Sequence, residues 1–141
     1  MKTPEKIIVS IQNSKYFRQA FTHSSYCHEF PEENSYETLE FLGDSVLNFQ
    51  TSLFIYHSFP HFAEGEMSKL KQLMVQESTL AYLSKEIGLD KFLQLGVGER
   101  KNKGAEKSSI LADVFESFVA ALYLEKGEKT VYKFLNLTLF S

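Results

Sequence analysis

The stretch that decides the fold is Glu37-Thr38-Leu39-Glu40-Phe41-Leu42-Gly43-Asp44-Ser45, which runs on into Val46 and Leu47. Read as an α-helix, at about 100° per residue, it separates two kinds of side chain. The acids Glu37, Glu40 and Asp44 share one face. The opposite side carries a continuous apolar stripe, made of Leu39, Leu42, Val46, Phe49 and Leu53. We therefore predict a helix over about residues 36–57, with the stripe in the core and the acids facing outward.

The composition is that of one globular domain. Of the 141 residues, 43% are hydrophobic, which is ample for a single buried core. The net charge of −3 argues against a domain that binds nucleic acid by electrostatics alone. The single cysteine, Cys27, excludes an intramolecular disulfide and a thiolate zinc site. Because no segment approaches eighteen consecutive apolar residues, we expect a cytoplasmic protein with no membrane partner.

Helical spacing of apolar residues recurs along the chain, and strand-type alternation is nearly absent. In the first part of the chain, the pattern predicts a short helix or ordered arm in residues 1–14 and a helix over 15–28 that ends in the polar turn Thr22-His23-Ser24-Ser25. A long helical segment follows over 67–87, with a candidate break near Glu77. After a polar segment over 88–108, the pattern predicts a helix over 109–126 and a last helix through 139. The polar segment holds the basic cluster Arg100, Lys101, Lys103 and Lys107. We predict an all-α fold, with residues 1–141 forming one domain.

A second pair of acids lies in the helix predicted over 109–126. Asp113 and Glu116 are the only charged residues between Ser108 and Leu124, and a helix that is apolar on almost every side is a central one. Carboxylates in such an apolar setting would destabilise the fold by several kcal/mol unless they are paired or bind a cation. Asp113 and Glu116, three residues apart, face the same way, as do Glu40 and Asp44 at a spacing of four. The two pairs together indicate a shared site.

An all-oxygen site of this kind suits Mg²⁺ or Mn²⁺. A di-iron bundle would need Glu-x-x-His pairs, and none of the four histidines has a glutamate three residues before it. The alternative is that the acids are a solvated helix surface, which the apolar setting of Asp113 and Glu116 disfavours. Oxygen-ligated divalent cations most often serve phosphoryl or phosphodiester chemistry.

Four ordered blocks of the chain resemble the endonuclease domain of the ribonuclease III family. Residues 36–47 closely resemble the family signature. The other three blocks are Ala20-Phe21-Thr22-His23-Ser24-Ser25-Tyr26, Glu64-Gly65-Glu66-Met67-Ser68-Lys69-Leu70 and Lys107-Ser108-Ser109-Ile110-Leu111-Ala112-Asp113-Val114-Phe115-Glu116.

The resemblance implies a homodimeric, all-helical endoribonuclease that hydrolyses double-stranded RNA by two-metal-ion catalysis. The implied cofactor is Mg²⁺, with Mn²⁺ as a substitute, and the implied products carry 5′-phosphate and 3′-hydroxyl ends with two-nucleotide 3′ overhangs. The biological setting would be RNA processing, including that of rRNA and mRNA.

The resemblance also implies roles for individual residues. Glu40, Asp44, Asp113 and Glu116 match the metal-binding acids, of which Asp44 and Glu116 are expected to be catalytic. Glu37 and Glu64 match acids that assist at the site or contact substrate. Phe41 matches an aromatic residue that inserts into the partner subunit, which would explain an apolar side chain among the acids. His23 is expected to be a structural hydrogen-bonding residue.

The chain also departs from the family pattern. Thr38 and Ala105 stand where relatives often have arginine, and Ser141 is reached before the double-stranded RNA-binding domain that follows in bacterial relatives. We expect either a truncated form, which we favour, or a natural short form that binds RNA weakly. A non-catalytic RNA-binding or ribosome-associated relative stays open as an alternative function, although all four acids are present.

Overall fold

The structure, a computed structural model, describes residues 3–141. The α-helices are α1 (Pro4–Ser10), α2 (Lys15–Ala20), α3 (Ser24–Glu29), α4 (Glu37–Ser58), α5 (Glu64–Met74), α6 (Glu77–Glu86), α7 (Val97–Lys101), α8 (Ser108–Lys126) and α9 (Glu128–Leu137), with 3₁₀ turns η1 (Leu89–Phe92) and η2 (Gly104–Glu106). Within residues 3–141 the only β-type pairing is an isolated parallel bridge between Thr22 and Gln94. The all-α prediction is confirmed. In the same range, no helix is long and apolar enough to cross a bilayer.

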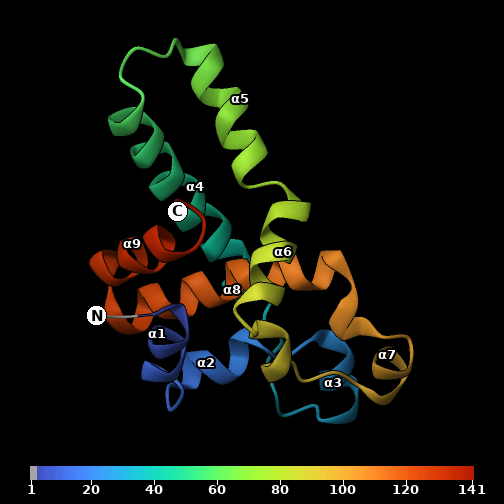
Figure 1. The fold of residues 1–141 in the computed structure, drawn as a ribbon. Helices are drawn as coiled ribbons and strands as arrows, with labels where there is room; N and C mark the ends of the chain where they lie inside the picture. Colours follow the sequence, from blue (N-terminus) through green and yellow to red (C-terminus); the bar gives the residue numbers. More distant parts are fainter. Residues whose placement is uncertain (1–2) are drawn as a thin grey trace.

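Helix α8 is the centre of the fold, as its apolar sequence predicts. It packs against α4, α6, α2 and α9, and it runs through the middle of the molecule (Figure 1). Phe118 on α8 is fully buried and lies beside the rings of Phe17, Phe21 and Phe134, with ring centroids 5.1 to 6.5 Å away. This aromatic cluster fixes α8 and leaves the acids of that helix facing α4.

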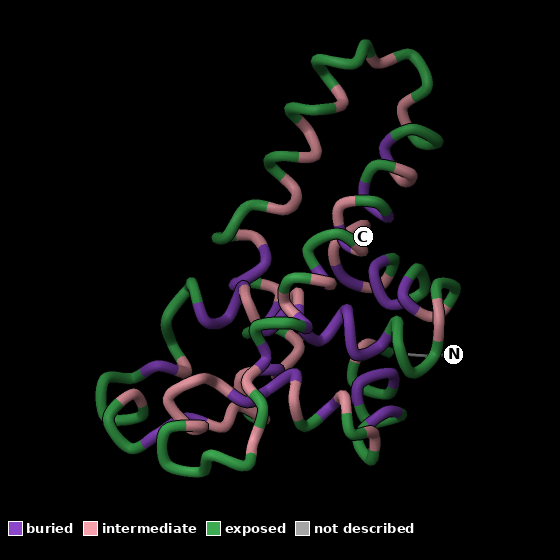
Figure 2. Tube along the Cα trace, turned by 180° about the vertical axis from the view of Figure 1, so that it is seen from behind, coloured by how far each residue is buried: buried purple, intermediate pink, exposed green. Residues whose placement is uncertain are grey.

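The second half of α4 and the whole of α5 form an arm that extends away from this core (Figure 1). Helix α5 packs mainly on α4, and none of its side chains is buried. Figure 2 shows α5 in the colours of exposed and partly buried residues, whereas the second half of α4 keeps a few buried residues and most other buried residues gather around α8. The arm therefore offers a large surface outside the core.

The predicted burial of the α4 stripe is partly wrong. Leu39 is buried, but Leu42 and Val46 are only half-buried at the edge of the core and Phe49 is 55% exposed. The buried face of α4 is rotated by roughly 90° from that stripe. Its residues are Leu39, Gly43, Leu47, Gln50, Thr51 and Ile55.

Gly43 is the physical reason for that rotation. A Cβ atom at position 43 would overlap the backbone carbonyl of Glu116, so α4 and α8 cross in direct backbone contact there. Burial on α4 is therefore centred on a glycine and not on the bulkiest apolar residues. The same close crossing brings Glu40, one turn earlier on α4, against the acids of α8.

Two predicted boundaries also change. The polar turn after residue 21 is not the end of one helix over 15–28, because α2 ends at Ala20 and α3 begins at Ser24. His23 caps α3, with its Nδ1 accepting a hydrogen bond from the backbone N–H of Ser25 at 3.0 Å.

The predicted break in the segment 67–87 is real and lies at Val75-Gln76. Gly88 ends that segment with φ 81°, a left-handed conformation that favours glycine.

Candidate metal centre

Three of the predicted metal ligands converge at the crossing of α4 and α8. Glu40, Asp113 and Glu116 each offer one carboxylate oxygen, and these atoms all lie within 4.8 Å of one another. All three residues are half-buried. The cluster exists because the helices meet at Gly43 and because a spacing of three residues places Asp113 and Glu116 on one face of α8. Its donor atoms are oxygens alone, the ligands that Mg²⁺ and Mn²⁺ prefer.

Asp44, the fourth predicted ligand, lies at the outer edge of this cluster. Its side chain is exposed, and it is close enough to Glu116 to share a hydrogen bond when Glu116 is protonated. The Asn48 amide Nδ2 donates to the backbone oxygen of Asp44 at 2.7 Å and to its Oδ1 at 3.3 Å. Asn48, which the sequence pattern did not single out, thus orients the Asp44 carboxylate from one turn away.

The electrostatics of the cluster fit a bound cation. Burial raises the pKa of the Glu116 carboxyl to about 8, and the adjacent Asp44 adds to that increase. Burial likewise raises the pKa of Glu40 to about 7, with Asp113 as its strongest neighbour. Crowded carboxylates resist becoming charged together near neutral pH. A divalent cation would offset their repulsion, so the residues present fit the metal that the sequence pattern predicts.

Tyr36 is a neighbour of the centre that sequence reasoning missed. Its side chain is only 3% exposed, and its hydroxyl donates to Oδ2 of Asp113 at 3.3 Å. Burial, and then the charge of Asp113, raise the pKa of the Tyr36 hydroxyl, which therefore keeps its proton. No spacing rule relates positions 36 and 113, so only the folded chain reveals the contact.

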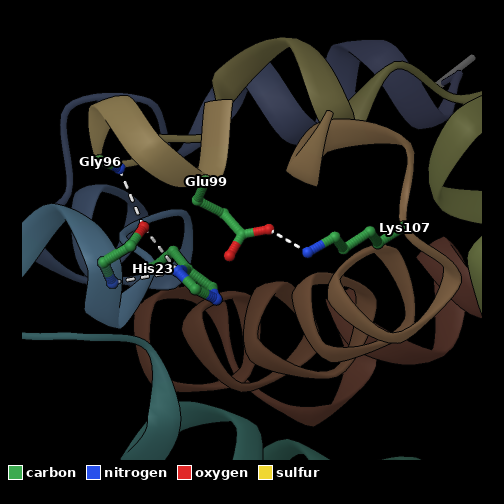
Figure 3. Close-up of polar contacts among 5 residues, drawn as sticks. His23, Gly96, Glu99 and Lys107 are labelled. Atoms are coloured by element: carbon green, nitrogen blue, oxygen red, sulfur yellow. Dashed lines mark hydrogen bonds and ion pairs between the residues drawn. The ribbon is translucent and has the colours of Figure 1, made fainter. Parts of the chain in front are cut away.

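A second polar cluster, drawn in Figure 3, ties the loop before α8 to α3. The backbone N–H of Gly96 donates to Ser25 Oγ at 2.9 Å, and that oxygen lies 2.8 Å from His23 Nδ1. Lys107, from the predicted basic cluster, is ion-paired with Glu99. His23 thus has the structural hydrogen-bonding role that we expected, and one of the four basic side chains is already paired.

Comparison with known protein families shows which family the chain belongs to. A family model described as ribonuclease-III-like matches residues 13–141. The chain belongs to the ribonuclease III family. The match covers all the acids named above.

Curated relatives in the ribonuclease III family carry the name Ribonuclease 3. The Spiroplasma citri protein is 46% identical over 131 residues, which cover 93% of this chain and 53% of that protein. The Bacillus licheniformis protein is 43% identical over 142 residues, covering 99% of this chain and 57% of that protein. The chain thus spans somewhat more than half the length of these relatives.

A solved ribonuclease III structure gives the same fold. The nuclease domain from Campylobacter jejuni is 33% identical, superimposes with a TM-score of 0.84, and covers 94% of each chain. In that Campylobacter domain a structurally flexible region is involved in dimer formation. The fold of this chain is therefore that of a ribonuclease III nuclease domain.

Two of the remaining residues that the ribonuclease III resemblance singled out lie beside the centre. Glu37 is exposed in the first turn of α4, where its charge acts on Glu40 and its Oε1 accepts a hydrogen bond from Ser35 Oγ at 3.1 Å. Phe41 is 79% exposed, the largest exposure among the big apolar side chains described. Its ring is available to a partner molecule.

Glu64, in contrast, does not lie at the centre of its own chain. It starts α5 and lines a pocket of about 320 Å³ in the arm, together with Phe49, Ser52, Leu53, Ile55, Tyr56, Met67, Ser68 and Lys71. Because α5 runs back along α4, Glu64 lies near Tyr56, about 18 Å along the helix axis from Asp44. Within one protomer, Glu64 is too far from Asp44 to act with it.

Proposed function

We propose that this chain is the nuclease domain of an endoribonuclease that hydrolyses double-stranded RNA with Mg²⁺, and that residues 1–141 form that one domain. The observation that carries the proposal is the convergence of Glu40, Asp113 and Glu116 within 4.8 Å at the crossing of α4 and α8. Membership of the ribonuclease III family supports the reaction class.

The four acids would hold the ions. We propose Glu40, Asp113 and Glu116 as the inner ligands, with Asp44 at the rim completing a set for two cations. When bound, such ions activate a water as nucleophile and offset the charge that develops on the phosphodiester. Glu40 and Glu116 must give up their protons to bind metal, so the apparent affinity should rise with pH up to about 8. Cleavage would leave 5′-phosphate and 3′-hydroxyl ends with two-nucleotide 3′ overhangs.

RNA recognition would depend on duplex shape and backbone contacts, because sequence-specific recognition of RNA needs unpaired bases. The net charge of −3 predicts weak binding by this domain alone, since phosphate affinity scales with the lysines and arginines engaged. Lys101 and Lys103 are exposed beside the paired Lys107, and they are the basic side chains of this loop that we expect to meet phosphate.

The working unit that we propose is a homodimer in which Phe41 of each protomer enters the arm pocket of the other. The pocket has the size for a phenyl ring and is lined mainly by apolar side chains, including Phe49, Leu53 and Met67. Phe41 sits between Glu40 and Asp44 on α4, so its insertion would bring Glu64 of the partner subunit to the metal centre. The dimer would thus hold two centres, one for each RNA strand, and it would explain how Glu64 acts.

The direct test is cleavage of a long RNA duplex with Mg²⁺ at low salt. Glu116→Gln should lower the rate by at least about 100-fold, since loss of a metal ligand removes several kcal/mol of stabilisation. Glu125→Gln is the matched control, because Glu125 is an exposed acid on the same helix. Equal cleavage by wild type and Glu116→Gln would contradict the proposal. RNA binding without cleavage by the wild type would favour a non-catalytic relative.

A further inference from the structure

The start of α4 carries a residue that connects the two acidic helices directly. Tyr36 immediately precedes α4, its backbone N–H donates to the Thr22 carbonyl at 2.9 Å, and its own carbonyl accepts from the Glu40 N–H at 2.8 Å. The backbone of Tyr36 is therefore held at both ends. From this fixed point the side chain reaches across to α8.

The hydroxyl of Tyr36 meets a predicted metal ligand. It donates to Oδ2 of Asp113 at 3.3 Å, and this is its one hydrogen-bond partner among residues 3–141. A hydrogen bond to one oxygen of a carboxylate restricts its rotamer and leaves the other oxygen, Oδ1, able to accept a cation. The O···O distance is long for an O–H···O bond, so we expect its effect on Asp113 to be modest.

The ring of Tyr36 is held independently of the hydroxyl. It is 3% exposed and meets the His23 ring edge-on, with centroids 5.9 Å apart at 68°. His23 is in turn fixed by Ser25. Phenylalanine at position 36 would keep this packing and lose only the bond to Asp113, so the two contributions can be separated by experiment.

We infer that Tyr36 is a positioning residue, which holds Asp113 in the orientation that presents its second oxygen to a metal beside Glu40 and Glu116. The inference rests on the proposed function, because it assumes that these acids bind a divalent cation. Tyr36 does not itself contact the metal. Its effect is on how well the acids of α8 are arranged before the ion arrives.

The test is Mn²⁺ binding to the free protein, measured by electron paramagnetic resonance without RNA. Tyr36→Phe should weaken Mn²⁺ binding by about 10-fold, the lower end of the range for partners of metal ligands. The matched control is Ser84→Ala, which also removes one buried hydroxyl bonded to α8, in this case to the Leu111 carbonyl at 2.7 Å. Ser84→Ala should bind Mn²⁺ like the wild type.

The outcomes are distinct. Unchanged binding by Tyr36→Phe would overturn the inference and leave the proposed metal site standing. Equal weakening in Tyr36→Phe and Ser84→Ala would also overturn it, because a general loss of α8 packing would then be the cause. No Mn²⁺ binding by the wild type would overturn both the inference and the proposed function.

Discussion

Gly43 on α4 lies directly against the backbone carbonyl of Glu116 on α8, with no room for a Cβ atom between them. This contact sets the separation of the two helices that carry the acids. The proposed metal centre therefore depends on the absence of a side chain at position 43 as much as on the carboxylates.

Gly43→Ala should destabilise the protein by about 3 kcal/mol or more, because the added methyl group meets backbone that cannot repack locally. Urea unfolding measures the change, and Mn²⁺ binding should weaken with it as the helices separate. The control is Gly65→Ala on α5, where a Cβ meets nothing within 4 Å. That variant should be up to about 1 kcal/mol more stable. Equal stability of Gly43→Ala and wild type would contradict direct backbone contact between α4 and α8 at this position.

The stability of the metal-free protein should fall as the pH rises from about 5 to about 8. Glu40 and Glu116 have pKa values of about 7 and about 8 in the folded state, above the ordinary 4.5. In this window the folded state binds more protons than the unfolded chain, so the free energy of unfolding decreases with pH. The contribution of these two carboxyls to the free energy of unfolding is complete below pH 4.5 and is lost above their pKa values in the folded state.

Urea midpoints in EDTA at about pH 5.5 and pH 8.5 measure this dependence. Glu116→Gln should flatten it, and Mg²⁺ should restore stability at the higher pH by binding the folded state. A midpoint that rises with pH in EDTA would contradict the burial of these acids.

Phe41→Ala should shift the protein toward monomer. Truncating a buried aromatic anchor typically costs at least 2 kcal/mol, or about a 30-fold weaker dimer. Ser52→Trp, which would fill the arm pocket from α4, should have the same effect. Tyr82→Ala is the control, since Tyr82 is 64% exposed on α6, outside the pocket. Sedimentation equilibrium distinguishes these variants, and a Phe41→Ala dimer as tight as wild type would exclude the proposed interface.

Thr51→Val should stabilise the protein by about 1 kcal/mol. Thr51 is fully buried on α4, and its Oγ1 is the one buried side-chain polar atom in residues 3–141 with no hydrogen-bond partner. Valine has nearly the same shape and removes the unsatisfied group. Ser117→Ala is the contrasting case, because Ser117 Oγ donates to the Ala20 carbonyl at 2.6 Å and its loss should be destabilising. Thermal melting of both variants tests the pair.

The sequence was sufficient for the helical fold class, for α8 as the central helix and for the proximity of Glu40, Asp113 and Glu116. These depend on local periodicity and on the cost of placing Asp113 and Glu116 in an apolar helix, which can be judged without coordinates. The family resemblance added expected roles for Glu37, Glu64 and Phe41 that periodicity alone does not give, and these roles stay predictions.

The sequence did not predict which face of α4 is buried. A helical projection gives most weight to bulky apolar residues, whereas α4 and α8 meet at Gly43. It did not predict that Tyr36 reaches Asp113, or that Glu64 lies at the far end of α4 from the acids. Each of these is a relationship between distant segments, set by how α4, α5 and α8 pack. Such relationships leave no spacing pattern in one chain.

The central claim is that Glu40, Asp113 and Glu116 hold a divalent cation at the crossing of α4 and α8. Anomalous diffraction from a crystal soaked in Mn²⁺ tests it most directly. The account predicts an anomalous peak among these three carboxylates, lost in Glu116→Gln. A wild-type crystal with no peak there, or with Mn²⁺ bound only elsewhere, would contradict it.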